Sequence, residues 1–332
     1  MESHQPNKKL KPNQCPVLAA PQVVLDDECH GGVRLTDAYI GRVVDKSLIG
    51  TLIQDLKTVL PMPTRLGHLK RVKGNEVILA MADEIDKSEC SRLVRDKLPQ
   101  LDSVICSAKV PLGPLRSKRQ HQEASSYWSC GFHPDKQLES MLSGQFFSQD
   151  ELTKHYKYMR MAIDEARKNN SHSAAFIVDP KRDQIMGSGF DNRLTNPALH
   201  ASVAALDTVA KNQCDTLPSR LKPDDVKASG SAEKLGEDVE IEKRKKPDDE
   251  IPYLCTGYDI YVTREPCLMC AMAMVHCRIR RVFYGCGTQH GALGTKTKLH
   301  TQTQLNHHYL VFKGILGEEC EKLMSSKEAL SC

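Results

Sequence analysis

The sequence predicts two folded units: an α+β unit of ferredoxin-like type, followed by an α/β unit. Three observations support this prediction. With 332 residues, the chain is long enough for two domains, because single domains usually contain about 100–200 residues. Residues 33–112 contain segments in the order β-α-β-β-α-β, which is typical of a ferredoxin-like sandwich. From residue 148 onward, strand and helix patterns alternate, as in layered α/β structures.

The boundaries between these units follow changes in composition. The chain starts with a polar, proline-containing segment, and such termini are usually mobile. A later stretch is highly charged, mixed in sign and almost without aromatic residues, so it cannot form a core. We therefore expect a disordered leader at 1–30, a basic α+β domain at 31–115, a linker at 116–147, and a second domain at 148–332 that carries a disordered insertion at about 211–252.

The elements of the first domain follow from apolar periodicity and turn residues. The predicted helix carries apolar residues at helical spacing and stops at Pro61, where a helix cannot continue. Gly74-Asn75 separates two short apolar runs, which indicates a hairpin. In chain order we expect a strand at 33–44, a helix at 47–60, the hairpin within 68–82, a helix opened by Ser88 at 88–98, and a strand at 103–110.

The second domain opens with the clearest helix signal in the chain. Ser148 and Glu151 form a capping box ahead of apolar residues at helical spacing, which predicts a helix from 148 to about 168. Another helix should start near Asn196-Pro197 and run through His200, since asparagine caps helices and proline suits the first turn. The remaining expected elements are strands at 174–179, 184–190, 258–263, 280–285 and 309–315, a helix after Pro266, and a last helix from about Glu318.

Composition excludes several classes of protein. The chain is 40% hydrophobic and 27% charged, as expected for a globular domain rather than a disordered or fibrous chain. It has no signal-like leader and no apolar run of about 20 residues, so we expect no membrane association and a location in cytoplasm and nucleus. Thirteen cysteines in such a chain favour metal binding or free thiols over a disulfide framework.

The first domain is more basic than the rest of the chain. Residues 33–121 contain 16 Lys and Arg against 10 Asp and Glu, a balance of +6, whereas the whole chain is at +4. Clustered cations can neutralise phosphates of a nucleic acid, although each of them can also be an ordinary solvated side chain. The candidates for RNA contact are Lys70, Arg71, Lys73, Arg116, Lys118 and Arg119.

Three residues of the second domain form a candidate metal site. Cys267 and Cys270 are three positions apart after Pro266, so both thiols can lie at the start of one helix, where thiolates are stabilised. His200 lies near the start of another helix that follows a strand. One histidine and two cysteines leave a fourth position open, which is the catalytic type of zinc geometry. We therefore expect one Zn²⁺ per chain.

These residues resemble the signature of the zinc-dependent nucleobase deaminases, H-x-E followed by P-C-x-x-C. The chain has His200-Ala201-Ser202 and Pro266-Cys267-Leu268-Met269-Cys270. The segments "EPCLMCAMAMVHCRIRRVFYG" and "LNHHYLVFKGILGEECEKL" are similar to the tRNA adenosine deaminase branch. The resemblance covers about 148–325 and implies a five-stranded mixed sheet flanked by helices. It also implies that Asn192 in "FDNRLTNP" belongs to the base pocket.

The chain departs from the signature at Ser202. The family uses a glutamate there to move protons during attack of the zinc-bound water, and a serine hydroxyl cannot replace it. Glu265 matches an additional glutamate of active relatives, and we expect it to be a structural hydrogen-bond acceptor. A pseudo-pocket containing Asn192 and Ser202 is thus predicted, with no catalytic residue.

The combination resembles the non-catalytic subunit of the eukaryotic heterodimeric tRNA adenosine deaminases, which convert wobble adenosine to inosine. It implies a catalytic deaminase subunit as partner, the tRNA anticodon arm as substrate, and a tRNA-presenting role for the N-terminal domain. Two alternatives stay open at this point. The chain could be an active deaminase with an unorthodox base, or a zinc-stabilised RNA-binding scaffold without a deaminase partner.

Overall fold

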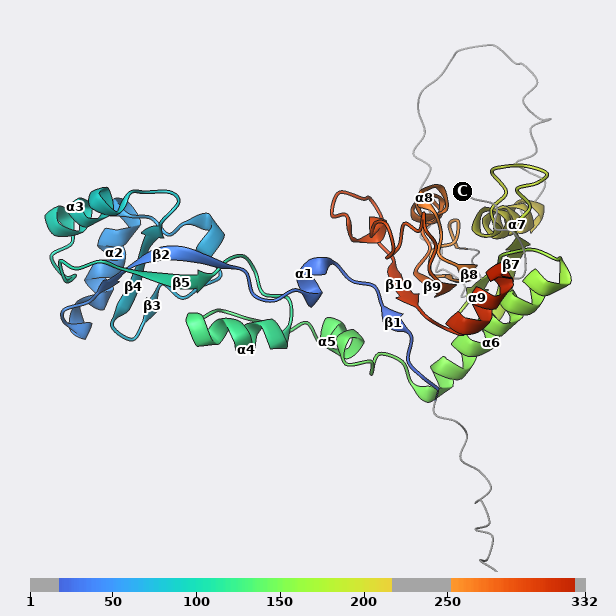
Figure 1. Cartoon of the computed structure of the whole chain (residues 1–332), viewed down its shortest axis with the longest axis horizontal. Coiled ribbons are helices and arrows are strands. Elements are labelled where there is room, and N and C mark those ends of the chain that lie inside the picture. The colour runs from blue at the N-terminus through green and yellow to red at the C-terminus, as the bar shows by residue number, and fades with distance from the viewer. Residues whose placement is uncertain (1–17, 217–251, 326–332) are drawn as a thin grey trace, which may run out of the picture. The chain divides into compact units, whose positions relative to one another are not determined.

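The computed structural model describes residues 18–216 and 252–325, which form two compact units (Figure 1). The N-terminal unit contains Asp26–Phe146, and the C-terminal unit contains the residues before Asp26 and those from Phe147 onward. Most of the predicted insertion, 217–251, lies outside the described residues. None of the described helices is both long and apolar enough to cross a bilayer.

The N-terminal unit is built on a four-stranded antiparallel sheet. Its strand order is β3-β4-β2-β5, and all neighbouring strands are antiparallel. The predicted β-α-β-β-α-β order is confirmed. The elements are α1 (Asp27–His30), β2 (Leu35–Arg42), η1 (Lys46–Leu48), α2 (Ile49–Val59), η2 (Thr64–Leu66), β3 (Val72–Lys73), β4 (Glu76–Met81), α3 (Lys87–Lys97), β5 (Cys106–Pro111), α4 (Lys118–Tyr127) and α5 (Lys136–Leu142).

Both faces of this sheet are covered, so the expected linker at 116–147 is wrong in its first part. Apolar residues of α2 and α3 pack on one face. On the other face, Trp128 is 2% exposed and packs in one cluster with Ala124 of α4 and Ile78 of β4. The sequence of α4 is almost wholly polar, because only Gln120 and Ala124 of this helix are buried. Its narrow apolar stripe gives little periodic signal.

The C-terminal unit contains a mixed six-stranded sheet, in the order β1-β10-β9-β8-β6-β7. The pairs β8/β9 and β9/β10 are parallel, and the other neighbours are antiparallel. All five strands predicted for this domain are present. The elements are β1 (Gln22–Val23), α6 (Gln149–Lys168), β6 (Ala174–Asp179), β7 (Gln184–Phe190), α7 (Ala201–Thr216), β8 (Asp259–Arg264), α8 (Leu268–His276), β9 (Arg281–Cys286), η5 (Leu299–Thr301), β10 (Leu310–Lys313) and α9 (Gly317–Ser325).

Helices cover both faces of this sheet (Figure 1). Helices α6 and α9 contact one face, and α7 and α8 contact the other. Small residues such as Ala205 and Ala271 let α7 and α8 approach strand residues Ile177, Ile260 and Val282 closely. The capping box predicted at the start of α6 is present, with Ser148 Oγ accepting from the amide of Glu151.

The sixth strand comes from the segment that we predicted to be a disordered leader. Gln22 and Val23 pair with β10, and the amide of Val24 donates to the carbonyl of Val311 at 2.9 Å. The ring Nε2 of buried His300 lies 2.9 Å from the Val24 carbonyl oxygen. The prediction of disorder at 1–30 is therefore wrong for these residues, because a two-residue strand is too short to show periodicity.

Two predicted helix starts are also displaced. Helix α7 begins at Ala201 rather than near Asn196. The side chain of Asn196 accepts from the amide of Ala198 at 3.0 Å, which closes a local turn before the helix. Helix α3 begins at Lys87 and is capped by Asp86, which accepts from the amide of Ser88. Asparagine and aspartate side chains accept the same kind of backbone hydrogen bond in a turn as at a helix start. The sequence alone therefore does not show which residue begins the helix.

A buried histidine under the C-terminal sheet gives a test of this core. His155 of α6 is 3% exposed, and its Nδ1 lies 2.8 Å from the hydroxyl of Tyr261. Its ring packs against Phe283, with ring centroids 4.3 Å apart. Burial, followed by the charges of Arg281 and Arg280, lowers the pKa of His155 to about 3. The folded chain therefore holds this ring neutral.

We expect the pH dependence of stability to report this ring. The unfolded chain binds a proton at His155 below its ordinary pKa of about 6.5, whereas the folded chain does not. Above that pKa, neither state binds the proton, and the unfolding free energy is at its full value. As the pH falls toward 3, only the unfolded chain gains the proton, so the unfolding free energy decreases. Between pH 7 and 5, wild type should lose about 2 kcal/mol more unfolding free energy than His155→Gln. Equal losses in urea titrations of both proteins would contradict this assignment.

Candidate metal centre

Two helix starts bring the predicted ligands together at one edge of the C-terminal sheet. His200 directly precedes α7, and its carbonyl accepts the first helical bond from the amide of Ala204 at 2.9 Å. Cys267 is the N-cap residue of α8, and Cys270 lies in the first turn of that helix. The predicted helix after Pro266 is confirmed.

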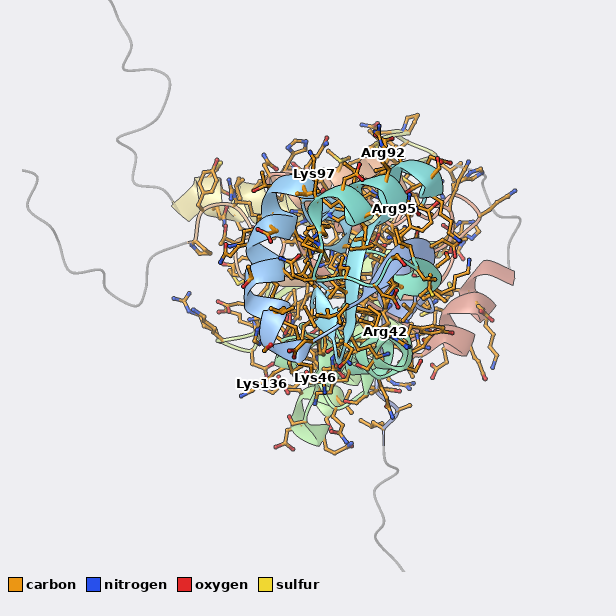
Figure 2. The ribbon with its side chains drawn as sticks, turned by 90° about the vertical axis from the view of Figure 1, so that its left-hand side faces the viewer. Arg42, Lys46, Arg92, Arg95, Lys97 and Lys136 are labelled. Carbon is orange, nitrogen blue, oxygen red and sulfur yellow. The ribbon has the colours of Figure 1, made fainter. Side chains whose placement is uncertain are left out.

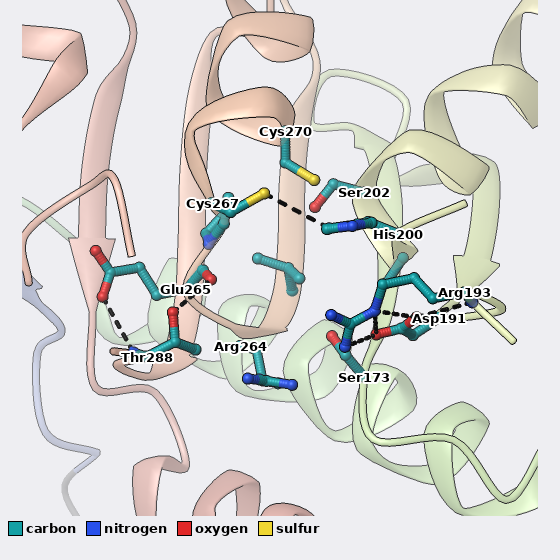
Figure 3. A pocket seen from close by; sticks show the side chains of 13 residues that line it. Ser173, Asp191, Arg193, His200, Ser202, Arg264, Glu265, Cys267, Cys270 and Thr288 are labelled. Atoms are coloured by element: carbon teal, nitrogen blue, oxygen red, sulfur yellow. Dashed lines mark hydrogen bonds and ion pairs between the residues drawn. The ribbon is translucent and has the colours of Figure 1, made fainter. Parts of the chain in front are cut away.

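The three side chains form a cluster that can hold a metal ion (Figure 3). The ligand atoms of His200, Cys267 and Cys270 all lie within 4.8 Å of one another. The distance from His200 Nδ1 to Cys267 Sγ is 3.5 Å. Tetrahedral zinc with Zn–S of about 2.3 Å and Zn–N of about 2.0 Å requires a separation of about 3.5 Å between these atoms. The donor set and its spacing therefore fit zinc.

The surroundings of Cys267 favour the thiolate, which is the form that binds metals. The side-chain hydrogen bond from Cys270 is the largest of the effects that lower the pKa of Cys267 to about 5. Backbone amides at the start of α8 and the charge of His200 act in the same direction, and burial opposes them. The site is thus prepared for a cation before one binds.

Ser202 lies in the cavity beside these ligands (Figure 3). It is in the first turn of α7 and is 2% exposed. The cavity has a volume of about 40 Å³, which corresponds to about three water molecules when each needs about 10–15 Å³ of this kind of volume. The cavity therefore has room for ordered water beside the ligands.

Glu265 also lines this cavity, and its carboxylate holds a neighbouring loop. The side chain is 3% exposed. Its Oε1 accepts from the amides of Leu293 and Thr295 at 2.9 and 3.0 Å, and Oε2 accepts from the amide of Thr288 at 3.3 Å and from the Thr295 hydroxyl. The prediction that Glu265 is a structural acceptor is confirmed.

The second lining carboxylate belongs to Asp191 and is neutralised by Arg193. Arg193 Nε lies 2.9 Å from each Asp191 oxygen, and both side chains are 10% exposed. This pair was not predicted from the sequence, although both residues flank Asn192. An acid and a base two positions apart in the loop after a strand are a signal that could have identified it.

Asn192 itself is not among the residues that line the cavity. Its side-chain oxygen accepts from the hydroxyl of Thr195 at 2.9 Å, and its backbone amide donates to the carbonyl of Leu199. Asn192 therefore shapes the loop that leads to His200. Of the two predicted pseudo-pocket residues, Ser202 lies beside the three predicted ligands and Asn192 lies outside the cavity lining.

Two of the predicted RNA contacts serve the N-terminal unit internally. The guanidinium of Arg71 donates to the carbonyls of Leu60 and Ile78, and burial lowers its pKa. Lys73 Nζ donates to the carbonyl of Tyr127 at 2.9 Å. Both cations therefore bond to backbone carbonyls of their own unit.

The other four candidates differ in how they are engaged. Arg119 donates to a main-chain carbonyl at 2.7 Å, and Arg116 pairs with Glu28 at 3.8 Å. Lys70 and Lys118 are exposed and make no side-chain bond or ion pair to the described residues. The structure thus leaves two of the six predicted cations unengaged.

Comparisons with known proteins agree with this site. Residues 152–286 match the family model of the cytidine and deoxycytidylate deaminase zinc-binding region, a range that contains all three ligands. The chain is 36% identical to the human probable inactive tRNA-specific adenosine deaminase-like protein 3, over 94% of this chain and 93% of that protein. It is 35% identical to the mouse protein of the same name, over 97% of each.

A more distant relative is the tRNA-specific adenosine deaminase subunit tad3 of Schizosaccharomyces pombe, which is 28% identical over 75% of this chain and 73% of that protein. The fold and the His-Cys-Cys cluster define a chain with a zinc-binding deaminase region. Within that class, the chain belongs to the family of the tRNA-specific adenosine deaminase-like protein 3.

Proposed function

We propose that this chain is the non-catalytic, zinc-binding subunit of a heterodimeric tRNA adenosine deaminase, with tRNA as the substrate of the complex. One observation carries the proposal. The two carboxylates that line the cavity beside the ligands are both bound elsewhere, Asp191 by Arg193 and Glu265 by the loop at 288–295. Among the lining residues, no free carboxylate remains to move a proton.

The lack of a proton-transferring group beside the ligands distinguishes a non-catalytic subunit from an active deaminase. Zinc at His200, Cys267 and Cys270 would hold the protein fold together and polarise a bound water. Deamination also requires a group that takes a proton and returns it to the base, and loss of such a group costs about 10²–10⁴ in rate. Ser202 cannot do this, because a serine hydroxyl carries no accessible negative charge at neutral pH. The chain therefore contributes binding and assembly.

Three finer assignments complete the proposal. We assign the N-terminal unit to the ferredoxin-like class, which is supported by the strand order β3-β4-β2-β5 and its antiparallel pairings. We assign β6 to β10 as the five-stranded deaminase sheet, with β1 as an added edge strand. The partner is a second deaminase chain with an intact His-x-Glu, since the complex needs one complete site.

Inosine formation by the separated and combined subunits tests this proposal. The purified chain should convert no wobble adenosine in a tRNA transcript above the background of buffer alone. Addition of the second chain should start conversion, and native mass measurement should give one copy of each chain. Turnover by the isolated chain would support an active deaminase with another base. Purification without any deaminase partner would support the RNA-binding scaffold instead.

A further inference from the structure

One loop of the C-terminal unit contacts both the metal-ligand segment and the strand β1. It spans residues 287–298, between β9 and η5, and we call it the bridging loop. At one side it pairs with the backbone of Cys267, and at its end it leads directly into η5, which contains His300. The contacts of this loop therefore connect the candidate metal centre to β1.

The first set of contacts holds the bridging loop against the ligand segment. Gly291 forms a β-bridge with Cys267, and the amide of Ala292 donates to the carbonyl of Pro266 at 2.9 Å. The carboxylate of Glu265 accepts hydrogen bonds from three backbone amides of the same loop. The backbone at a metal ligand and directly before it therefore sets the position of this loop.

Hydrogen bonds within the bridging loop make it a rigid segment. The amide of Lys296 donates to the carbonyl of Gly291 at 2.9 Å, and the amide of Leu299 donates to the carbonyl of Ala292 at 3.0 Å. A rigid segment with contacts at both ends can transmit a change at one contact to the other.

The second set of contacts joins the bridging loop to Val24, the residue after β1. His300 follows the loop, and its Nε2 lies 2.9 Å from the carbonyl oxygen of Val24. The side chain of Val24 is buried in one core cluster with Ala292 and Leu293. At Gly294, a Cβ would lie 3.4 Å from Val24 Cγ1, so the loop backbone adjoins this side chain. Val24 is thus held by the loop as well as by the sheet.

β1 is the shortest strand of the C-terminal sheet, with two residues. It lies at the sheet edge and pairs there with β10. Segments that are held by few bonds open locally at low free energy, so the contacts of Val24 decide how firmly β1 is docked. The N-terminal unit begins at Asp26, so β1 fixes the point where the chain enters that unit.

Packing alone does not explain why His300 is a histidine. The side chain is 6% exposed, and its Nδ1 has no hydrogen-bond partner among the described residues. A buried nitrogen without a partner is unfavourable, and an apolar ring would fill the same space without this cost. Burial lowers the pKa of His300, so the ring is neutral and its Nε2 donates to the Val24 carbonyl. The bond that holds Val24 gives a reason for the histidine.

Metal binding stabilises the other end of this series of contacts. The ligand atoms of His200, Cys267 and Cys270 lie within 4.8 Å of one another, so without a cation the protein alone has to keep two thiols and an imidazole together. The free energy of metal binding favours the folded arrangement of the ligands and of the backbone that carries them. Because the bridging loop is bonded to that backbone, we expect it to be held more firmly when metal is bound.

We propose that metal binding at the His-Cys-Cys cluster strengthens the docking of β1 through the bridging loop, an inference that rests on the zinc-binding part of the proposed function. The coupling is reciprocal, so a docked β1 raises the metal affinity by the same factor. The metal site thereby has a second role besides stabilising the C-terminal unit. It secures the segment from which the N-terminal unit begins.

Hydrogen exchange, measured by mass spectrometry on the full-length chain, tests the effect of the metal on β1. The chain is compared with zinc bound and after zinc removal by EDTA. The amide of Val24, which donates to the Val311 carbonyl, should exchange at least about fivefold faster without zinc. Two references should keep their rates: α6 in the C-terminal unit, and α3 in the N-terminal unit, the helix that carries Arg92 and Arg95 in Figure 2.

A matched pair of variants tests the reverse direction. His300→Phe keeps a ring at this position and removes the bond to Val24. His307→Phe is the control, since the Nε2 of His307 likewise lies against a main-chain carbonyl of the same unit, that of Ile279, at 2.7 Å. The zinc affinity of each full-length variant is measured by competition with a chromogenic chelator. His300→Phe should bind zinc at least about fivefold more weakly than wild type, and His307→Phe should stay within about twofold.

Three results would overturn the inference. They are unchanged exchange at Val24 after zinc removal, equally accelerated exchange in α6, and equal zinc affinities of the two variants. All three would leave the proposed function intact, because the chain would still bind zinc. Absence of zinc uptake by the wild-type chain would instead contradict the proposed function.

Discussion

Replacement of Cys270 by alanine is expected to remove zinc from the chain and to destabilise the C-terminal unit. Loss of a group that only supports a metal ligand already weakens metal binding by about 10–100-fold, so loss of a ligand should weaken it by more than about 100-fold. A 100-fold loss removes about 2.7 kcal/mol of stabilisation from bound metal. For a unit of this size, the melting temperature should fall by about 5–10 °C.

A second buried cysteine provides the control for this prediction. Cys255 is buried like Cys270, and it lies outside the His-Cys-Cys cluster. Cys255→Ala should keep one zinc ion per chain, measured by elemental analysis, and respond to a chelator as wild type does. Cys270→Ala should show no further response to the chelator. Full zinc content in Cys270→Ala would remove this residue from the ligand set.

The sequence predicts the metal cluster well because its chemistry is local. Cys267 and Cys270 lie three positions apart at a helix start, and such spacing places two thiols together whatever the rest of the fold does. His200 joins them because α7 and α8 begin at the same sheet edge, which the strand and helix order already indicates. The helix start itself was misplaced by about one turn, but this did not move His200 out of the cluster.

Features that depend on distant contacts could not be predicted in the same way. Trp128 and α4 complete the core of the N-terminal unit, but a helix with two buried residues has almost no apolar period. The sequence "SKRQ" does contain a capping box, Ser117 with Gln120, which the structure forms and which could have indicated this helix. The engagement of Arg71 by backbone carbonyls has no sequence signal, because its partners lie in other elements.

The pairing of Asp191 with Arg193 illustrates the same limit within the candidate site. Both residues can be read from the sequence, but only the fold shows that they line the cavity and bind each other at 2.7 Å. The resemblance to the deaminase signature predicts that Ser202 stands where active relatives have a proton-transferring glutamate. The structure adds that, among the described residues that line this cavity, both carboxylates are already engaged.

Glu265→Gln is expected to be strongly destabilising, although it changes one atom. All four contacts of the Glu265 carboxylate are donors, three of them backbone amides. A glutamine places an N–H₂ group against some of these donors, which leaves buried groups unpaired at about 1–3 kcal/mol each. Gly291 leaves little room for rearrangement, since a Cβ at this position would lie 2.1 Å from the Glu265 carboxyl carbon.

The expected loss of unfolding free energy is about 2–4 kcal/mol, with a fall in melting temperature of about 5–15 °C. Hydrogen exchange should speed up at the amides of Thr288, Leu293 and Thr295, which lose their acceptor. Exposed Glu318 supplies the matched control, and Glu318→Gln should change stability by less than about 0.5 kcal/mol. A Glu265→Gln protein with wild-type stability and slow exchange in this loop would show that the carboxylate has no structural role. The buried position of the Glu265 carboxylate beside the metal cluster would then indicate a chemical role.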